Sequence, residues 1–335
     1  MILVTGATGR LGTQVVRVLR SIGLDVRCLV RKGSEYFWLN DTGAAYFFGD
    51  LRDQASVERA MNGVRHVIAA HGVRVERTGN DHRAVNAGGS ATLFAAARSR
   101  GVEHVVYISC AAVEADDDVP ALSSKRAAET ALASSGLSYT VLRPGLFVQN
   151  FADLARRVET NGNVFLPGSP RTSVSPIHTR DLALMALASL ELPALKNATV
   201  RVGGPESMTI QEAFSRMCQV NGLPAAHWPL PPSGLRALAA VARPLGRRWS
   251  NHARALAVLY SHSSAVDGAS MATTFGIPLT PYDDAARTAF VERHQSEDPT
   301  AREEKVVHRQ FTATIYEPGV IKWDDLPSGP PPRRD

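Results

Sequence analysis

The stretch Thr5-Gly6-Ala7-Thr8-Gly9-Arg10-Leu11-Gly12 decides the fold predicted for this chain. It follows a short apolar segment, Met1–Thr5, and opens a segment with apolar residues at helical spacing, Leu11–Leu19. Its three glycines allow a tight turn, a close approach of backbone to a pyrophosphate, and close packing of helix on strand. The start of the helix offers N–H groups to phosphate. We therefore expect the glycines, together with Thr8, Arg10 and Leu11, to bind a dinucleotide; the alternative is a turn in a non-binding α/β protein.

Outward from this loop, short apolar segments alternate with helical patterns through residue 143. The further predicted strands are Val26–Val30, Ala45–Phe48, Val64–Ala70, His104–Ser109 and Ser138–Leu142, and the helices are Gln54–Met61, Ala84–Arg100 and Leu122–Ala133. This alternation is typical of βαβ units around a parallel sheet. The predicted fold class is α/β, a doubly wound parallel Rossmann sheet with a smaller, mostly helical C-terminal part.

The order of elements changes after Pro144. A polar, glycine-rich region, Asn161–Arg171, precedes a helix at Thr179–Leu190, a strand at Ala198–Val202 and helices at Ile210–Val220, Leu235–Leu245, His252–Tyr260 and Tyr282–His294; prolines dominate Pro224–Pro232. The predicted division is a Rossmann domain at 1–223, a helical substrate or partner region at 224–295, and an extended or disordered tail at 296–335.

Composition excludes several classes of protein. The chain has 335 residues, of which 44% are hydrophobic and 21% charged, as in ordinary globular proteins. We find neither a leader peptide nor a run of about 18 apolar residues, which a spanning helix needs. These features predict a cytoplasmic protein, with peripheral association to a membrane complex left open. The three widely spaced cysteines predict neither a disulfide framework nor a metal site.

The net charge of +5 does not by itself identify a partner. Only five of the 37 basic residues are lysines, and the basic residues are scattered among acids, whereas a nucleic-acid footprint should cluster. Nucleic acid is therefore not favoured as a partner. The charge suits a phosphate-bearing ligand or a weakly acidic partner.

Basic residues stand where a second phosphate would lie. The second predicted strand ends at Arg31-Lys32, where a protein specific for NAD carries an acid for the ribose 2′-OH. A guanidinium can instead pair with a 2′-phosphate, and Arg10 could face the same group. This pattern favours NADP(H) over NAD(H); the alternative is that Arg31 and Lys32 only end a strand.

Other loops at this edge of the sheet complete the predicted site. Asp50 and Leu51 follow the third strand and are predicted to contact adenine, because doubly wound folds bind ligands at the carboxyl ends of their strands. Ala70 and Gly72 follow the fourth strand and are small enough to let a cofactor pass. Between them, His71 is expected to be a loop residue near the ribose rather than a catalyst.

Six segments carry a resemblance to a known family. TGATGRLG, RCLVRK, FFGDL, VVYISC, YTVLRPG and SPIHTRDLA, spread over residues 1–220, resemble an atypical short-chain dehydrogenase/reductase. The NmrA-like branch fits best; it includes Ycf39-like proteins of photosynthetic organisms and bacterial NAD(P)H-binding relatives. The resemblance implies the Rossmann fold and the cofactor class, and Ycf39-like relatives imply work with membrane photosynthetic complexes.

The catalytic pattern of the wider superfamily is incomplete. That pattern is a serine, a tyrosine and a lysine four residues after the tyrosine; the ammonium lowers the phenol pKa so that the phenol can exchange a proton with substrate. Here Ser109 ends the fifth strand and Lys125 begins the next helix, but Ala121 stands where the tyrosine would be. Resemblance to isoflavone-reductase-like relatives implies that lysine can serve alone. Lys125 therefore either catalyses, with Ser109, or only binds the ribose.

Several neighbouring residues receive lesser roles. Pro144 is predicted to let the chain turn over the nicotinamide end, with Phe147–Phe151 lining a pocket in which Asn150 binds substrate. His178 is expected to be an internal hydrogen-bonding residue rather than a general base. Tyr107 and Cys110 are expected to pack rather than react.

Two functions remain open. One is an NADPH-dependent reductase of a small apolar carbonyl or quinone. The alternative is a non-catalytic NADP(H)-binding regulator, scaffold or assembly factor with a protein partner. The stripe of apolar residues and arginines at Leu235–Trp249 suits a helix covering the pocket, or one lying on a membrane or partner. The oligomeric state is not predicted.

Overall fold

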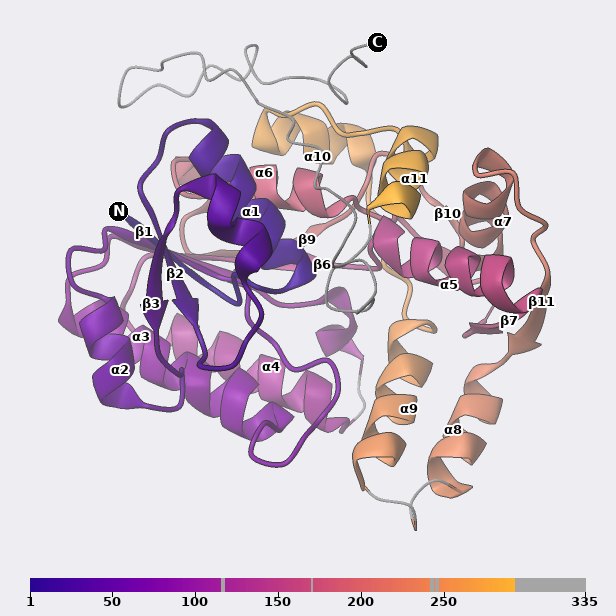
Figure 1. Ribbon diagram of the computed structural model, residues 1–335, viewed down its shortest axis with the longest axis horizontal. Coiled ribbons are helices and arrows are strands. Elements are labelled where there is room, and N and C mark those ends of the chain that lie inside the picture. The colour runs from indigo at the N-terminus through magenta and orange to yellow at the C-terminus, as the bar shows by residue number, and fades with distance from the viewer. Residues whose placement is uncertain (116–117, 170, 242–243, 245–246, 293–335) are drawn as a thin grey trace.

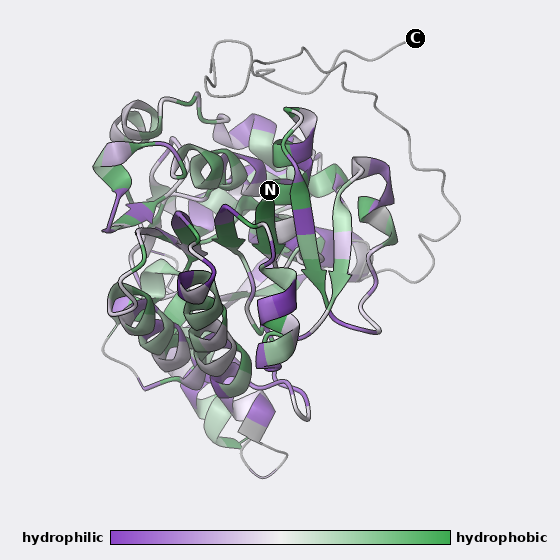
Figure 2. Cartoon of the chain, turned by 90° about the vertical axis from the view of Figure 1, so that its left-hand side faces the viewer, coloured by the Kyte–Doolittle hydropathy of each residue, from purple (hydrophilic) through white to green (hydrophobic). Residues whose placement is uncertain are grey.

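A computed structural model describes residues 1–115, 118–169, 171–241, 244 and 247–292. Its centre is a seven-stranded parallel sheet in the order β3-β2-β1-β4-β5-β6-β9 (Figure 1). The strands are β1 (Ile2–Thr5), β2 (Val26–Val30), β3 (Ala45–Phe48), β4 (His66–Ala69), β5 (His104–Ile108), β6 (Tyr139–Pro144) and β9 (Ala198–Val202). Parallel strands buried on both faces need apolar side chains in both directions, and hydrophobic colour runs along them (Figure 2). The predicted fold class is confirmed. The tail predicted at 296–335 lies outside the described residues.

Helices cover both faces of the sheet. Figure 1 shows α1 (Arg10–Ser21) and α6 (Thr179–Ala188) on one face, and α2 (Gln54–Ala60), α3 (Ser90–Ser99) and α4 (Pro120–Ala133) on the other. Short helices stand at η1 (Phe37–Thr42), η2 (Arg83–Gly89), η3 (Ala111–Glu114) and η4 (Pro193–Leu195). The strand order changes direction between β1 and β4, which is where such folds bind dinucleotides.

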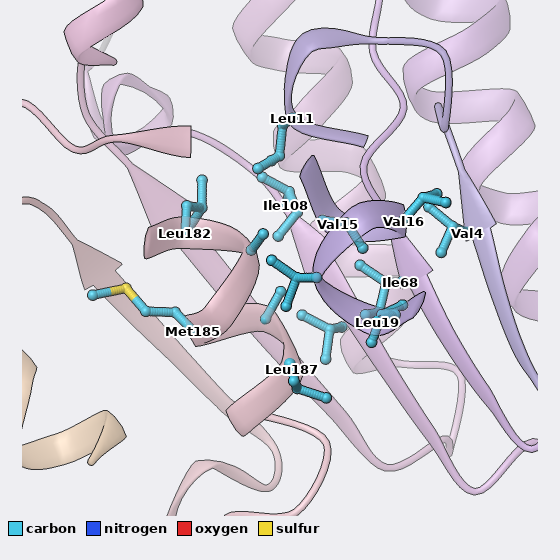
Figure 3. Packing of buried hydrophobic residues seen from close by; sticks show 14 of the residues in the cluster. Val4, Leu11, Val15, Val16, Leu19, Ile68, Ile108, Leu182, Met185 and Leu187 are labelled. Carbon is cyan, nitrogen blue, oxygen red and sulfur yellow. The ribbon is translucent and has the colours of Figure 1, made fainter. Parts of the chain in front are cut away.

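The layer formed by α1 and α6 is the largest part of the core. Figure 3 shows Val15 and Leu19 of α1 facing Ile68 of the sheet and Leu182 and Leu187 of α6. These side chains are buried because α1 repeats apolar residues at helical spacing and α6 is apolar around most of its surface. This packing holds the first turn of α1 against the sheet.

A second cluster unites the middle of the chain with its C-terminal part. α5 (Val148–Asn161), α7 (Ile210–Val220) and α11 (Tyr282–Val291) bury their apolar faces against one another. The buried Asp181 carboxylate accepts hydrogen bonds from the backbone N–H and the hydroxyl of Thr280, at 2.9 and 2.8 Å. The chain after residue 223 is therefore tied closely to the Rossmann part.

Two helices extend from this body. β7 (Val164–Pro167) pairs in parallel with β11 (His227–Leu230), and β8 (Ser173–Val174) pairs with β10 (Met208–Thr209). From β11 the chain enters α8 (Pro232–Val241), returns through α9 (Arg247–Leu259) and continues to α10 (Gly268–Phe275). α9 lies beside α4 (Figure 1). None of the helices in the described ranges has the length and hydropathy to cross a bilayer.

The structure differs from the predicted elements where long-range contacts determine the secondary structure. The single helix predicted at 84–100 is a π-helical segment, η2, followed by α3. α5 lies where we predicted pocket-lining residues, β7 lies in the region predicted as irregular, and β11 lies in the proline-rich segment. Among the described residues β7 and β11 pair only with each other, and the paired residues Val164 and His227 are 63 positions apart, so local sequence does not predict the pairing.

Leu182→Ala should destabilise the fold. Leu182 of α6 is fully buried in the core layer that this helix forms with α1 and the sheet. Truncating such a leucine to alanine costs about 2–5 kcal/mol of stability, because the cavity left behind adds to the lost transfer free energy. Urea unfolding followed by circular dichroism measures the change. Leu238→Ala, at a half-exposed position on α8, is the matched control and should stay within about 0.5 kcal/mol. Equal losses in both variants would contradict the described core.

Candidate cofactor and active site

The glycine loop forms a cradle that side chains would fill. A Cβ added to Gly12 would lie 2.0 Å from the Gly6 carbonyl oxygen, and one on Gly6 would lie 2.6 Å from the His71 Cα. Gly6 also has a φ of +68°, which favours glycine. Gly9 precedes α1 and donates its N–H to the Gly6 carbonyl at 2.9 Å. The first turn of α1 therefore presents its N–H groups above β1 and β4, which fits a bound pyrophosphate.

A buried histidine supports this loop from below. His71 Nδ1 lies 2.7 Å from the Thr5 hydroxyl and Nε2 lies 2.9 Å from the Ser90 hydroxyl. Burial, aided by the nearby Lys125 charge, lowers the pKa of His71 to about 3, so its imidazole is neutral at pH 7. His71 joins the ends of β1 and β4 to α3. This agrees with its expected role as a loop residue and gives it a structural task.

A cavity of about 530 Å³ opens at the carboxyl ends of β2 and β3. Both strand ends line it, through Arg31 after β2 and Asp50 after β3. Its basic side chains are Arg31, Lys32, Arg52 and Arg59. The cavity thus combines a positive wall with the place where the adenosine end of a dinucleotide lies in this fold. The structure brings together three predicted residues here, Arg31, Lys32 and Asp50.

Asp50 is engaged by a neighbouring arginine. Its carboxylate accepts from the Arg52 guanidinium at 2.6 and 2.9 Å, and this hydrogen bonding holds the pKa of Asp50 below its ordinary value. Arg52 also donates to the Gly79 carbonyl, and Arg31 donates to the Asn80 side chain at 2.7 Å. A turn at 77–80 is therefore held across the cavity by the two arginines. Sequence reasoning did not identify Arg52, although it stands two residues after Asp50.

The other predicted cofactor residues have varied surroundings. Arg10 pairs with Asp153 of α5 at 2.8 Å, so in this structure its guanidinium is directed toward α5. Leu11 and Leu51 are buried, and their side chains belong to the core rather than to a ligand surface. Ala70 packs beside the same core, and its carbonyl oxygen lies under Gly6. Cofactor binding by Thr8, Leu11 and Leu51 stays a prediction.

The two predicted catalytic residues meet at the end of β5. Lys125 Nζ donates to the Ile108 carbonyl at 2.9 Å, the peptide group that precedes Ser109. The Ser109 side chain is buried, and its hydroxyl has no hydrogen-bond partner among the described residues. Burial lowers the pKa of the Lys125 ammonium. A Cβ on Gly72 would lie 3.9 Å from Lys125 Nζ, so the loop after β4 passes close to the amine.

An asparagine missed by sequence reasoning joins both walls of this site. Asn86 Oδ1 accepts from the Val73 N–H at 3.0 Å, and its Nδ2 donates to the Ser124 hydroxyl at 3.2 Å. It therefore fixes the loop after β4 to the helix that carries Lys125. Asn86 lies in the π-helical η2, a type of segment frequent at functional sites. A polar residue inside a helix pattern otherwise rich in small residues was the available signal.

The segment after β6 differs from its predicted role. Pro144 ends β6 and is buried. Asn150 Oδ1 accepts from the Phe147 N–H at 2.7 Å and so caps α5, which leaves its oxygen engaged in the fold. Phe151 is fully buried in the second core cluster and does not line an open pocket. The substrate role of Asn150 stays a prediction, and the structure adds that its oxygen serves to start α5.

The lesser predictions hold for three residues. Tyr107 is fully buried and packs edge-on against Phe94 with ring centroids 5.8 Å apart. Burial raises the pKa of the Cys110 thiol, which disfavours a reactive thiolate. His178 caps α6 by accepting from the Arg180 N–H at 3.2 Å.

Comparison with models of protein families identifies the family of this chain. The model of the NmrA-like family matches residues 1–245, which include the cradle, Ser109 and Lys125. The chain belongs to the NmrA-like family. This confirms the resemblance drawn from the six sequence segments.

Curated relatives of this NmrA-like protein include both enzymes and assembly factors. It is 31% identical over 221 residues (66% of this chain and 69% of the relative) to the photosystem II assembly factor Ycf39 of Trieres chinensis. It is 28% identical over 229 residues (68% and 76%) to an NAD(P)H azoreductase of Xenophilus azovorans. It is 33% identical over 227 residues (67% and 75%) to the (4-alkanoyl-5-oxo-2,5-dihydrofuran-3-yl)methyl phosphate reductase of Streptomyces griseus. Both predicted functions therefore have relatives.

Solved structures share the fold. The NADPH-dependent quinone oxidoreductase QOR2 of Escherichia coli, complexed with NADPH, superposes with a TM-score of 0.68 at 20% identity, over 87% of this chain and 100% of that chain. The triphenylmethane reductase of Citrobacter, complexed with NADP(H), gives a TM-score of 0.67 at 23% identity, over 86% and 99%. The comparisons support an NAD(P)H-binding family and do not distinguish NADP(H) from NAD(H).

Gly12→Ala should abolish measurable NADPH binding. The new Cβ would meet the backbone of Gly6 and Ala7, so the first turn of α1 must move away from β1. NADPH fluorescence titration measures the effect. Gly88→Ala is the matched control, because its Cβ would lie 3.6 Å from the nearest atom, an ordinary contact. Unchanged affinity in Gly12→Ala would show that the cradle is not the pyrophosphate site.

Proposed function

We propose that this NmrA-like protein is an NADPH-dependent reductase of a small apolar acceptor, a quinone or another conjugated carbonyl. The observation that supports this proposal most is the arrangement at the end of β5. There Lys125 donates to the peptide group beside Ser109, whose hydroxyl has no hydrogen-bond partner in the described part of the chain. That arrangement stands at the same edge of the sheet as the glycine cradle and the basic cavity. The relatives named as an NAD(P)H azoreductase and as a (4-alkanoyl-5-oxo-2,5-dihydrofuran-3-yl)methyl phosphate reductase support it.

Each part of the site has a role in this proposal. NADPH, when bound, supplies a hydride. The cradle of Gly6, Gly9 and Gly12 holds the pyrophosphate, and Arg31 with Lys32 holds the 2′-phosphate. The Ser109 hydroxyl donates a hydrogen bond to the substrate oxygen. Lys125 holds the ribose and carries a proton at Nζ.

The missing tyrosine restricts the substrate class. Ala121 cannot give a proton, so a simple ketone would lack the phenol that normally protonates its oxygen. A quinone spreads the negative charge that develops during reduction over its conjugated system. It can then take a proton from the Lys125 ammonium or from water. Conjugated acceptors are therefore the substrates that the remaining residues serve.

Lys125→Arg should separate catalysis from cofactor binding. Arginine keeps the positive charge but does not give up a proton at ordinary pH, so quinone turnover should fall about 10²–10⁴-fold while NADPH binding persists. Burial lowers the pKa of Lys125, so wild-type turnover should decline as the pH rises through that lowered pKa, because the donor loses its proton. Stopped-flow oxidation of NADPH across pH measures both effects. If Lys125→Arg reduced quinones at the wild-type rate, Lys125 would act only as a cofactor ligand.

Arg31→Ser should weaken NADPH binding and leave NADH binding nearly unchanged. Loss of a charge-assisted contact to the 2′-phosphate is expected to cost about 10- to 100-fold in affinity. Arg31→Asp should go further and favour NADH. Arg65→Ser is the control, since Arg65 precedes β4 at the opposite edge of the sheet. Tighter NADH binding by the wild-type chain would contradict the proposed NADP(H) preference.

The second candidate function is a non-catalytic NADP(H)-binding assembly or regulatory factor. Ala121 in place of the tyrosine and the similarity to Ycf39, named as a photosystem II assembly factor, favour it. A panel of quinones, carbonyls and azo compounds decides between the two functions. Intact NADPH binding without turnover of any acceptor would favour the assembly or regulatory function.

A further inference from the structure

One long segment of the chain contains no acidic residue. Between Glu212 and Asp267 the sequence contains six arginines and neither aspartate nor glutamate. Elsewhere the two signs of charge are interspersed. This segment includes β11, α8 and α9, the elements that extend from the body in Figure 1.

The outer face of α8 is apolar and exposed. Leu235 and Ala239 are buried, whereas Leu238 and Val241, one turn apart, are 52% and 73% exposed. Trp249, in the first turns of α9 and across the connection from Val241, is 50% exposed. α8 therefore has a second apolar face that the described part of the chain does not cover.

The base of the two helices carries a further exposed aromatic pair. Phe165 of β7 and Trp228 of β11 contact each other with ring centroids 5.3 Å apart and ring planes tilted by 45°, and they are 57% and 55% exposed. Because β11 leads directly into α8, this pair and the outer face of α8 belong to one continuous stretch of structure. We call Phe165, Trp228, Leu238, Val241 and Trp249 the apolar set.

Arginines accompany the apolar set. Arg236 is exposed on α8, two residues before Leu238, and the Arg248 guanidinium lies 5.5 Å from the centre of the Trp249 ring. Aromatic and aliphatic side chains beside arginines, with no acids, are typical of surfaces that lie in the interface of an anionic bilayer. Leu238 and Val241 cannot hydrogen-bond a phosphate backbone or a base edge, so nucleic acid would leave them exposed.

We propose that α8 and α9, with the Phe165–Trp228 pair, form a docking surface for an anionic lipid bilayer. The apolar set enters the headgroup boundary, while the arginines pair with lipid phosphates. This docking function is separate from the proposed reductase activity. It does not depend on whether the protein reduces a substrate.

The docking surface is connected to the active-site rim. The Asn251 amide of α9 donates to the Glu76 carboxylate, in the loop after β4, at 2.9 Å. Val258 of α9 packs with Leu122 of α4, the helix that carries Lys125. A docked protein would therefore hold this rim near the lipid, where apolar quinones concentrate.

Sedimentation with vesicles tests the proposal on the full chain. Vesicles of phosphatidylcholine with phosphatidylglycerol are compared with pure phosphatidylcholine. One variant combines Leu238→Asp with Val241→Asp, and a second combines Arg236→Glu with Arg248→Glu. The matched controls are Val291→Asp, an exposed aliphatic residue on α11, and Lys196→Glu, an exposed base before β9. NADPH titration verifies that every variant is folded.

The wild-type chain should bind the anionic vesicles, and binding should fall with salt. One basic residue near such a surface contributes about fivefold to partitioning, so the double arginine variant should bind at least about 25-fold more weakly. The double aspartate variant should also lose binding, and both controls should keep it. Brominated lipid should quench the tryptophan fluorescence less in Trp249→Phe than in the wild type.

Three results would overturn the proposal. One is the absence of binding to anionic vesicles; binding to an acidic protein instead would assign the surface to that class of partner. Another is equal binding to neutral and anionic vesicles. The third is wild-type binding by either double variant.

Discussion

The structure depends on the contact between the backbone of Gly6 and that of Gly12. A side chain at Gly12 would come within 2.0 Å of the Gly6 oxygen, so helix α1 can approach β1 this closely only with glycine there. Gly6 in turn touches the backbone of His71 at the end of β4. One turn thus sets the height of the α1 N-terminus above two strands. The positions of the phosphate cradle and of the loop beside Lys125 both follow from it.

The surroundings of Lys125 hold one buried positive charge, that of its own ammonium. The neighbouring His71 is kept neutral by burial and by that same ammonium. The Lys125 ammonium donates one hydrogen bond to the Ile108 carbonyl and lies 5.4 Å from the centre of the Tyr107 ring. A second cation close by would be costly in a site of low dielectric. The site therefore retains the positive half of the superfamily's tyrosine–lysine pair. In the proposed reductase, Lys125 is therefore the residue assigned to proton transfer.

Sequence patterns predicted what is encoded locally. The glycine loop, the six strands before residue 145 and Arg31 at the end of β2 could all be placed from periodicity and strand order. Ser109 and Lys125 were found through the family resemblance. Arg10–Asp153 and the Asn150 cap could not, because each depends on how α5 packs. The divided helix at 83–99 was also missed, since a π-helical turn at Asn86 leaves the spacing of apolar residues almost unchanged.

The C-terminal region is where we expect this chain to differ from relatives that share its cofactor-binding fold. The family match ends at residue 245, within the hairpin formed by α8 and α9, whereas the cradle and Lys125 lie well inside it. Relatives that match about two thirds of this chain are named both as reductases and as assembly factors. In this chain α9 contacts Glu76 and the start of α4, so the C-terminal region reaches the rim of the proposed site. The proposed docking surface on the outer side of α8 and α9 would hold that site at a lipid bilayer.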